Sequence, residues 1–223
     1  MRLFHLAFDL PLERRDIAGF RAAVARAAGL EQDLFHNHRN DGSVQYRYPL
    51  VQYRSERGNA AIVGIDEGGK AIYDWFSRCD GKLWWNKAEH PLRIQRLNVD
   101  EHPIRYNESL QTYRLHQYLA LNQNHYRAWA NMTDLAARAA ELDRILVAHI
   151  LTFCRAVNWR LPERLDAAVV SIGSTYRTRL MGNDLMAFDL TFRSNLYLPA
   201  HIGLGKGVSH GFGVCRPARD RMT

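Results

Sequence analysis

The chain has few cysteines and no long apolar run. Its three cysteines, Cys79, Cys154 and Cys215, stand far apart, and no Cys-x-x-Cys pair occurs. An odd set of isolated cysteines indicates neither a zinc knuckle nor a disulfide framework. No apolar run reaches the roughly 18 residues that a membrane-spanning helix needs, and the N-terminus lacks the pattern of a secretory signal. We therefore expect a cytoplasmic protein with no membrane association, no bound metal and no cofactor.

Lysine is also scarce, although the chain is basic. The formal net charge is +7, and the only lysines are Lys70, Lys82, Lys87 and Lys206. Most of the positive charge therefore comes from arginine, whose forked guanidinium suits contacts to phosphate and stacking on bases. A basic chain is attracted to polyanions, but many basic proteins bind no nucleic acid. The charge supports a nucleic-acid partner without establishing one.

The first half of the chain predicts the order β-α-β-β-α-β. Alternating or apolar segments indicate strands, and apolar residues at a spacing of three to four indicate helices. That order is typical of a ferredoxin-like fold. The expected strands cover residues 2–10, 43–54, 59–65 and 92–99, and the expected helices cover 16–28 and 69–79.

The second half begins near Pro103 and predicts a similar compact unit. An aromatic extended segment covers 105–122, and Thr133 can cap a long helix over 134–157 with one apolar face. Further strands are expected over 165–172, 186–198 and 211–216. The chain thus predicts two compact halves of one architecture, joined near residues 100–104.

The segment 203–213 contains five glycines within eleven residues. Glycine loses more backbone entropy on ordering than other residues, so such a cluster needs a reason. One reason is a backbone that approaches an anion closely with its N–H groups, flanked here by Lys206 and His210. The alternative is a glycine-rich turn with no ligand. The spacing fits neither a Walker loop nor the G-x-G-x-x-G fingerprint of dinucleotide-binding folds.

A second group of polar residues follows the first expected helix. His36 and His38 precede a segment rich in tyrosine and arginine, which includes Tyr46, Tyr48, Arg47, Arg54 and, just before it, Arg39. Imidazole transfers protons near neutral pH, tyrosine stacks on bases or donates to phosphate, and arginine neutralises phosphate charge. One alternative is that both histidines are ordinary surface residues. Another is a metal site formed with Asp41, but no further ligand stands at a suitable spacing.

These segments resemble a known family of proteins. The glycine spacing G-h-G-x₅-G-h-G, with h apolar, resembles the C-terminal loop of the RAMP superfamily. The amino-acid sequence of residues 198–213 is similar to that of CRISPR-associated endoribonucleases, which cut repeat RNA into guide RNAs. Similar blocks occur in both halves of the chain: 36–42, 48–53 and 60–68 in the first, and 150–159, Phe188-Asp189 and Asn195 in the second.

The resemblance implies an α+β fold of two tandem ferredoxin-like (RRM-like) domains, over 1–102 and 103–223, with RNA crossing a basic cleft. It also implies metal-independent cleavage of repeat RNA. Of the two histidines we favour His38 for proton transfer, because His36 follows an apolar pair and is more easily packed. Tyr46 or Tyr48 would orient the phosphate. The expected RNA contacts are Arg39, Arg47, Arg54, Gly203, Gly205, Lys206, Gly207, His210, Gly211 and Gly213.

Two other functions stay open on the sequence. The chain could be a non-catalytic subunit that binds repeat RNA within a CRISPR effector complex. It could also be a general RNA-binding module with no preference for repeat RNA. In all three cases the partner is RNA. The sequence does not decide between a monomer and a homodimer.

Overall fold

The computed structural model describes residues 1–29, 32–36, 47–103 and 105–218. The chain divides into two compact units, and each is described separately. Unit 1 comprises Met1–His102 together with Ser209–Gly211, and unit 2 comprises Pro103–Val208 and the chain from Phe212 onward. A short piece of the glycine-rich segment therefore packs with unit 1, although it is distant from that unit in sequence.

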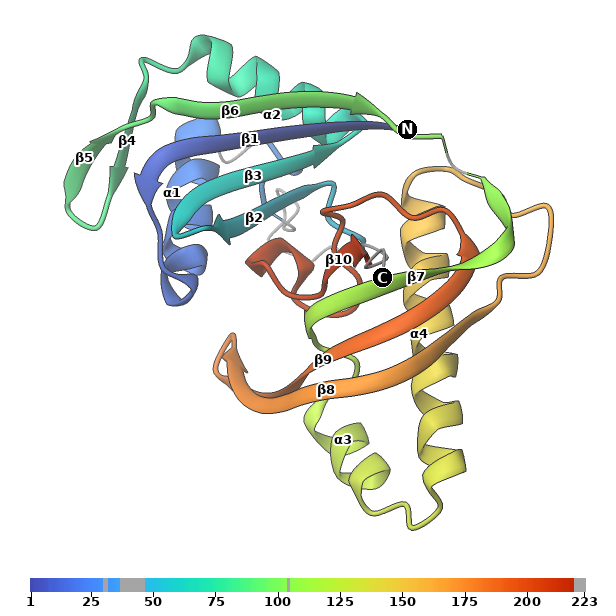
Figure 1. Cartoon of the computed structure of the whole chain (residues 1–223). Helices are drawn as coiled ribbons and strands as arrows, with labels where there is room; N and C mark the ends of the chain where they lie inside the picture. Colours follow the sequence, from blue (N-terminus) through green and yellow to red (C-terminus); the bar gives the residue numbers. More distant parts are fainter. Residues whose placement is uncertain (30–31, 37–46, 104, 219–223) are drawn as a thin grey trace, which may run out of the picture. The chain divides into compact units, whose positions relative to one another are not determined.

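Unit 1 has the strand order expected of a ferredoxin-like fold (Figure 1). Its four-stranded antiparallel sheet has the order β2-β3-β1-β6. A short 3₁₀ turn, Arg14–Asp16, precedes the first helix. The elements are β1 (Arg2–Pro11), α1 (Ile17–Ala28), β2 (Val51–Glu56), β3 (Asn59–Ile65), α2 (Glu67–Arg78), β4 (Lys82–Trp85), β5 (Ala88–Pro91) and β6 (Ile94–Glu101).

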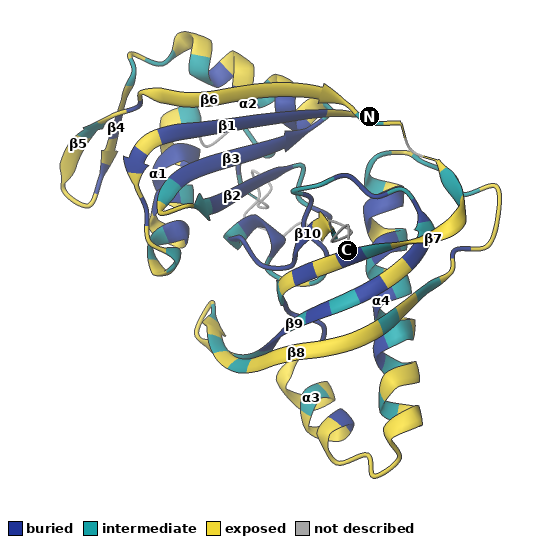
Figure 2. Cartoon of the chain, in the orientation of Figure 1, coloured by how far each residue is buried: buried dark blue, intermediate teal, exposed yellow. Residues whose placement is uncertain are grey.

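The core of unit 1 lies between the sheet and the helices α1 and α2. Every second residue of β1, beginning at Phe4, joins this core, as the period of two in a strand requires. Phe20 of α1 and Trp75 of α2 contribute the large side chains from the helix side. Figure 2 shows β1, β3 and much of β2 as buried, whereas β6 is exposed.

Two features of unit 1 differ from the sequence-based expectation. The strand expected over 43–54 begins only at Val51, and residues 37–46 lie outside the described part of the chain. The hairpin of β4 and β5 was not expected at all. Its turn residues Asn86 and Lys87 have φ of 49° and 63°. Such a turn usually contains glycine, and this one does not, so the sequence lacked the usual hairpin signal.

Unit 2 has the same strand order in its sheet as unit 1, but its described residues lack the second helix. Its antiparallel sheet has the order β10-β7-β9-β8. The place of the second helix between β9 and β10 is taken by the glycine-rich segment, which contains only the 3₁₀ turn Val208–His210. The elements are β7 (Tyr106–Tyr118), α3 (Gln123–Ala130), α4 (Leu135–Ala156), β8 (Ala167–Leu180), β9 (Asn183–Leu196) and β10 (Val214–Pro217).

The long helix α4 forms where the apolar spacing predicted it. Leu142, Leu146, Ile150 and Phe153 are buried along one face of the helix. The cap is Asp134 and not Thr133, because the Asp134 carboxylate accepts from the N–H of Ala136 at 2.8 Å. Helix α3 was not expected; it is only eight residues long. Among the described residues, no helix is both long and apolar enough to cross a bilayer.

Candidate functional site

Part of the expected catalytic loop lies outside the described residues: His38, Arg39 and Tyr46. His36 is described and half-buried, at the end of a short turn segment. The preceding Phe35 is 2% exposed and packs edge-on against Trp75 at 5.9 Å between ring centroids. The hydroxyl of Tyr53 donates to the carbonyl of Phe35 at 3.2 Å. The start of the histidine loop is therefore fixed to the core of unit 1.

The residues after this loop form a buried hydrogen-bonded chain. The amide of Gln52 donates to the hydroxyl of Tyr48 at 2.9 Å and to the carbonyl of Pro49 at 3.0 Å. The guanidinium of Arg54 donates to the side-chain oxygen Oε1 of Gln52 at 2.6 Å. Tyr48 and Arg54 are 7% and 2% exposed, whereas Arg47 is exposed. This burial favours a supporting role for Tyr48 and Arg54 and leaves Arg47 available to a ligand.

The glycines of segment 203–213 allow a backbone path that other residues resist. Gly205, Gly207, Gly211 and Gly213 all have φ between 64° and 92°, in the left-handed region. A Cβ added to Gly213 would lie 1.8 Å from the carbonyl oxygen of Leu204. The fold of the loop itself therefore explains much of the glycine content.

Several N–H groups of this loop are already paired inside unit 2. The N–H of Leu204 donates to Gly213 at 2.8 Å, and the N–H of Gly213 donates to Gln117 at 3.0 Å. The N–H of Lys206 donates to the carbonyl of Leu119 at 3.0 Å, while the Lys206 residue is exposed. These three N–H groups are not available to an anion. What the loop presents to solvent at this point is the ammonium group of Lys206.

The histidine of the glycine-rich segment is poorly suited to hold positive charge. Burial lowers the pKa of His210 to about 4, with a further contribution from the nearby charge of Arg21. The hydroxyl of Ser209 lies 3.3 Å from the Nδ1 atom of His210. His210 is therefore neutral at neutral pH, so it cannot act there as a cation for phosphate.

A hydrogen-bonded pair of the buried Tyr118 and the half-buried His149 lies beside the glycine-rich segment in unit 2. The hydroxyl of Tyr118 is 2.6 Å from Nδ1 of His149. Burial lowers the pKa of His149 to about 4, with a further contribution from the charge of Lys206. A Cβ on Gly205 would lie 2.7 Å from the ring of Tyr118. The pair thus supports the loop that presents Lys206.

Unit 2 also contains an exposed histidine held by a carboxylate, for which the sequence carries no local signal. Nδ1 of His116 lies 2.9 Å from Oδ1 of Asp189. The same oxygen accepts from the N–H of Gln117 at 2.8 Å and from the hydroxyl of Tyr176 at 3.2 Å. Gln117 has φ of 53° at a bulge of β7, which directs the His116 side chain, 60% exposed, toward solvent.

Three arginines lie near His116 on the exposed face of the same sheet. Arg114 of β7 is directly opposite Arg216 of β10, and Arg193 lies on the neighbouring strand β9. All three are exposed, while the residues that alternate with them, including Leu115, are buried (Figure 2). Like charges placed directly opposite each other destabilise a sheet. Within the described ranges, no ion pair joins these arginines to a carboxylate, so the face suits a polyanion.

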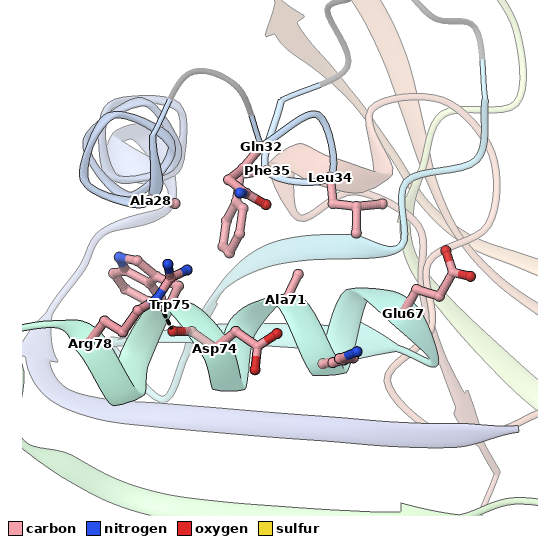
Figure 3. Close-up of a pocket in the computed structure, with 10 residues that line it drawn as sticks. Ala28, Gln32, Leu34, Phe35, Glu67, Ala71, Asp74, Trp75 and Arg78 are labelled. Carbon is pink, nitrogen blue, oxygen red and sulfur yellow. Dashed lines mark hydrogen bonds between the residues drawn. The ribbon is translucent and has the colours of Figure 1, made fainter.

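Two further features of the described residues bear on metal and anion binding. They contain no group of three or more His, Cys, Asp or Glu side chains that could hold a metal. A cavity of about 350 Å³ lies in unit 1 beside α2 (Figure 3). Its charged lining is balanced, with Glu67 and Asp74 against Lys70 and Arg78. This cavity therefore lacks the excess positive charge that a phosphate site needs.

Comparison with protein families gives a match over both units. Residues 1–103 match the family model of the Cas6b N-terminal domain, and residues 105–218 match that of the Cas6b C-terminal domain. The chain is also 25% identical over 122 residues to an uncharacterized protein of Methanocaldococcus jannaschii. That alignment covers 55% of this chain and 78% of the relative.

Solved structures share the fold over nearly the whole chain. A crystal structure of Cas6b matches with a TM-score of 0.82 at 20% identity, covering 98% of this chain and 100% of its own. A second, described as the CRISPR RNA processing endoribonuclease Cas6b, matches with a TM-score of 0.73 at 18% identity and the same coverage. The type IV crRNA endonuclease Csf5 matches with a TM-score of 0.58 at 14% identity, covering 97% of this chain and 98% of its own.

Proposed function

Because the chain belongs to the Cas6b family, we propose that it cleaves CRISPR repeat RNA into guide RNAs. The matches of both halves to the two Cas6b domains are the observation that supports this function. They confirm the family that the sequence suggested, and the solved structures confirm the tandem ferredoxin-like fold. We place the division between the two functional domains at residues 102 and 103, giving domains 1–102 and 103–223.

We propose that the cleavage needs no metal ion. RNA supplies its own nucleophile, the 2′-OH next to the scissile phosphate. The protein then has to remove the 2′-OH proton, stabilise the more anionic phosphorane and protonate the leaving 5′-oxygen. The 2′-oxygen forms a bond to phosphorus as the bond to the 5′-oxygen breaks. The products are a 2′,3′-cyclic phosphate and a 5′-OH, and no hydroxide from a metal is required.

The proton-transfer group in this proposal is His38, with His36 as the second candidate. A positioned histidine supplies a rate factor of roughly 10²–10⁴. His36 directly follows Phe35, which is fixed by its contacts with Trp75 and Tyr53. Such an anchor holds the start of the loop in place, as a catalytic group two residues later requires. Tyr46 stays a candidate donor to the phosphate.

The buried chain of Tyr48, Gln52 and Arg54 has a supporting role in this proposal. Its hydrogen bonds fix the backbone where the loop rejoins the sheet at Val51. Loss of the Tyr48 hydroxyl would therefore affect cleavage through the position of the loop. In this proposal, Arg39 and the exposed Arg47 contact the phosphate directly.

RNA contacts in unit 2 are assigned to its exposed cations. The arginines Arg114, Arg193 and Arg216 provide positive charge on the exposed face of the sheet, and Lys206 provides it on the glycine-rich segment. Counterion release from RNA phosphates makes such contacts favourable and dependent on salt. The glycines contribute by allowing the tight backbone path that presents Lys206.

Incubation of the purified protein with labelled repeat RNA in EDTA tests the function. We expect cleavage at one position in the repeat and none in an unrelated RNA of equal length. Binding of repeat RNA without cleavage would indicate the non-catalytic subunit of an effector complex instead. Equal binding of both RNAs without cleavage would indicate a general RNA-binding module. Cleavage that requires added magnesium or zinc would contradict the metal-free mechanism.

A further inference from the structure

The imidazole of His116 is exposed, yet a carboxylate fixes its orientation. Its Nδ1 atom lies 2.9 Å from Oδ1 of Asp189, and the side chain is 60% exposed. Asp189 is itself held from two strands, because the N–H of Gln117 in β7 and the hydroxyl of Tyr176 in β8 donate to the same oxygen. An exposed side chain held in this way loses rotamer freedom, so the arrangement needs a reason. The bulge of β7 does not supply one, since Asp189 already accepts from the N–H of Gln117 there.

The contact with Asp189 decides which ring nitrogen of His116 carries the proton. An ionised carboxylate only accepts hydrogen bonds, so the proton between the two side chains belongs to Nδ1 of His116. In the uncharged ring, Nε2 then has a lone pair and is an acceptor. Within the part of the chain that the structure describes, no group is bonded to Nε2. The uncharged ring therefore presents an acceptor to solvent and not a donor.

The surroundings of His116 suit the sugar-phosphate chain of RNA. Arg114 precedes His116 by two residues in β7, so both side chains lie on the exposed face with Cα atoms about 7 Å apart. Arg216 lies directly opposite Arg114 and adds a second guanidinium. Arginine donates to phosphate oxygens, whereas a neutral acceptor such as Nε2 repels them. The partner that fits Nε2 is therefore a hydroxyl group close to a phosphate.

We propose that Nε2 of His116 accepts a hydrogen bond from a ribose 2′-OH, while Arg114 binds the phosphate next to that ribose. In RNA the 2′-OH stands on the carbon next to the one that carries the 3′-phosphate. RNA has this donor and DNA lacks it, so the contact makes the exposed face of unit 2 selective for RNA. Asp189 is a positioning residue, because it holds the ring without touching the RNA. The inference rests on the proposed binding of repeat RNA, but not on its cleavage.

Two other roles for His116 make less use of this geometry. As a cation for phosphate the ring would need a proton on both nitrogens, and Arg114, Arg193 and Arg216 already provide positive charge on this face. As a platform for base stacking the ring would not need the proton on a particular nitrogen. The acceptor role uses both the Nδ1 proton that Asp189 fixes and the exposed Nε2.

A deoxynucleotide scan of the repeat RNA tests this contact. Each RNA of the scan carries one 2′-deoxynucleotide at a different position, and all carry another immediately 5′ of the cleavage site to prevent cleavage. With the wild-type protein, one position of the scan should lower affinity about threefold to tenfold, the net contribution of one hydrogen bond. With His116→Phe the same position should have no effect, because the acceptor is gone while an aromatic ring stays. Such a double-mutant cycle isolates a single contact.

His125→Phe is the matched control, because His125 is another exposed histidine of unit 2, in α3. It should leave the scan unchanged, and both variants should melt near the wild-type temperature, since Asp189 keeps two other donors. The same sensitive positions in wild type and His116→Phe, or none in either, would overturn the proposal. So would a salt dependence that weakens by about one unit in His116→Phe, which would make the ring a cation for phosphate. The expected scan together with uncut all-ribose RNA would contradict the proposed cleavage alone.

Discussion

At the scale of single residues, the surroundings of each histidine decide whether it can transfer a proton. Burial lowers the pKa of both His149 and His210 to about 4, so both rings are neutral at neutral pH and neither is suited to act there as a general acid. The histidines of the loop after α1, His36 and His38, stay as the candidates for catalysis.

The His38→Ala variant should lose most cleavage under single-turnover conditions and keep nearly full affinity for repeat RNA. A proton-transfer group acts in the transition state and contributes little to ground-state binding. His36→Ala should lose less activity, or should lower the melting temperature because its ring is half-buried. If His38→Ala cleaves at the wild-type rate, the assignment of His38 is wrong.

The half-buried His149 predicts how stability depends on pH. Its pKa is about 4 in the folded protein against an ordinary value of 6.5, so the unfolded chain binds more protons between these values. Stability is therefore present above pH 6.5 and is lost as the pH falls toward 4. Each unit of pKa difference corresponds to about 1.4 kcal/mol. When the pH falls from above 6.5 to below 4, the free energy of unfolding should therefore decrease by about 3 kcal/mol because of His149.

Urea unfolding of the His149→Gln variant at pH 7 and pH 4.5 measures this effect. Glutamine has an amide oxygen that can accept from the Tyr118 hydroxyl, but it does not titrate. The difference in unfolding free energy between the two pH values should be smaller in the variant than in the wild type. An equal difference in both proteins would show that His149 does not titrate on unfolding as proposed.

At the scale of elements, long and regular segments were predictable and short or strained ones were not. The apolar spacing of Leu142, Leu146 and Ile150 predicted helix α4, because many residues repeat the same signal. The hairpin β4–β5 was not predicted from the sequence because its turn, Asn86-Lys87, contains no glycine. In the same way, the contact between His116 and Asp189 joins residues of two strands and leaves no local pattern.

The candidate site could be predicted only in part, because contacts between residues far apart in the sequence leave no local pattern. The glycine-rich segment and the paired histidines stand out locally. The burial of Tyr48 and Arg54 follows from tertiary packing, which local patterns do not reveal. The opposition of Arg114 and Arg216 depends on a strand pairing between residues about a hundred positions apart.

The glycine-rich segment predicts a position-specific loss of stability. Gly213→Ala should destabilise the protein by several kcal/mol, because Cβ would meet Leu204 and the residue keeps φ of 64°. Gly173→Ala is the control, since its Cβ meets only ordinary contact at 3.4 Å. Thermal unfolding compares the two variants. Similar melting temperatures would contradict the packing explanation of these glycines.

The opposed arginines of β7 and β10 predict a gain in stability with a loss of binding. Arg216→Thr removes one of two like charges that face each other, so unfolding free energy should rise by about 0.2–1 kcal/mol. Affinity for RNA should fall, and the salt dependence of binding should weaken by about one unit. Arg155→Ala, on the exposed side of α4, is the control for charge alone. Unchanged affinity in Arg216→Thr would remove this face from the RNA site.

At the scale of the whole molecule, the two units contribute different parts of one proposed activity. Unit 1 anchors the histidine loop, and unit 2 provides the arginine face and the glycine-rich segment apart from Ser209–Gly211. Family membership extends over both units, which explains why blocks in both halves of the sequence were informative.

The proposed chemistry requires the RNA to provide the nucleophile, and a single substitution in the RNA tests this requirement. A repeat RNA with one 2′-deoxynucleotide immediately 5′ of the cleavage site should bind with unchanged affinity. It should not be cut in EDTA, while the all-ribose RNA yields a 2′,3′-cyclic phosphate and a 5′-OH. Cleavage of the deoxy-substituted RNA at the same position would show that water or another group attacks the phosphate, and would contradict the proposed mechanism.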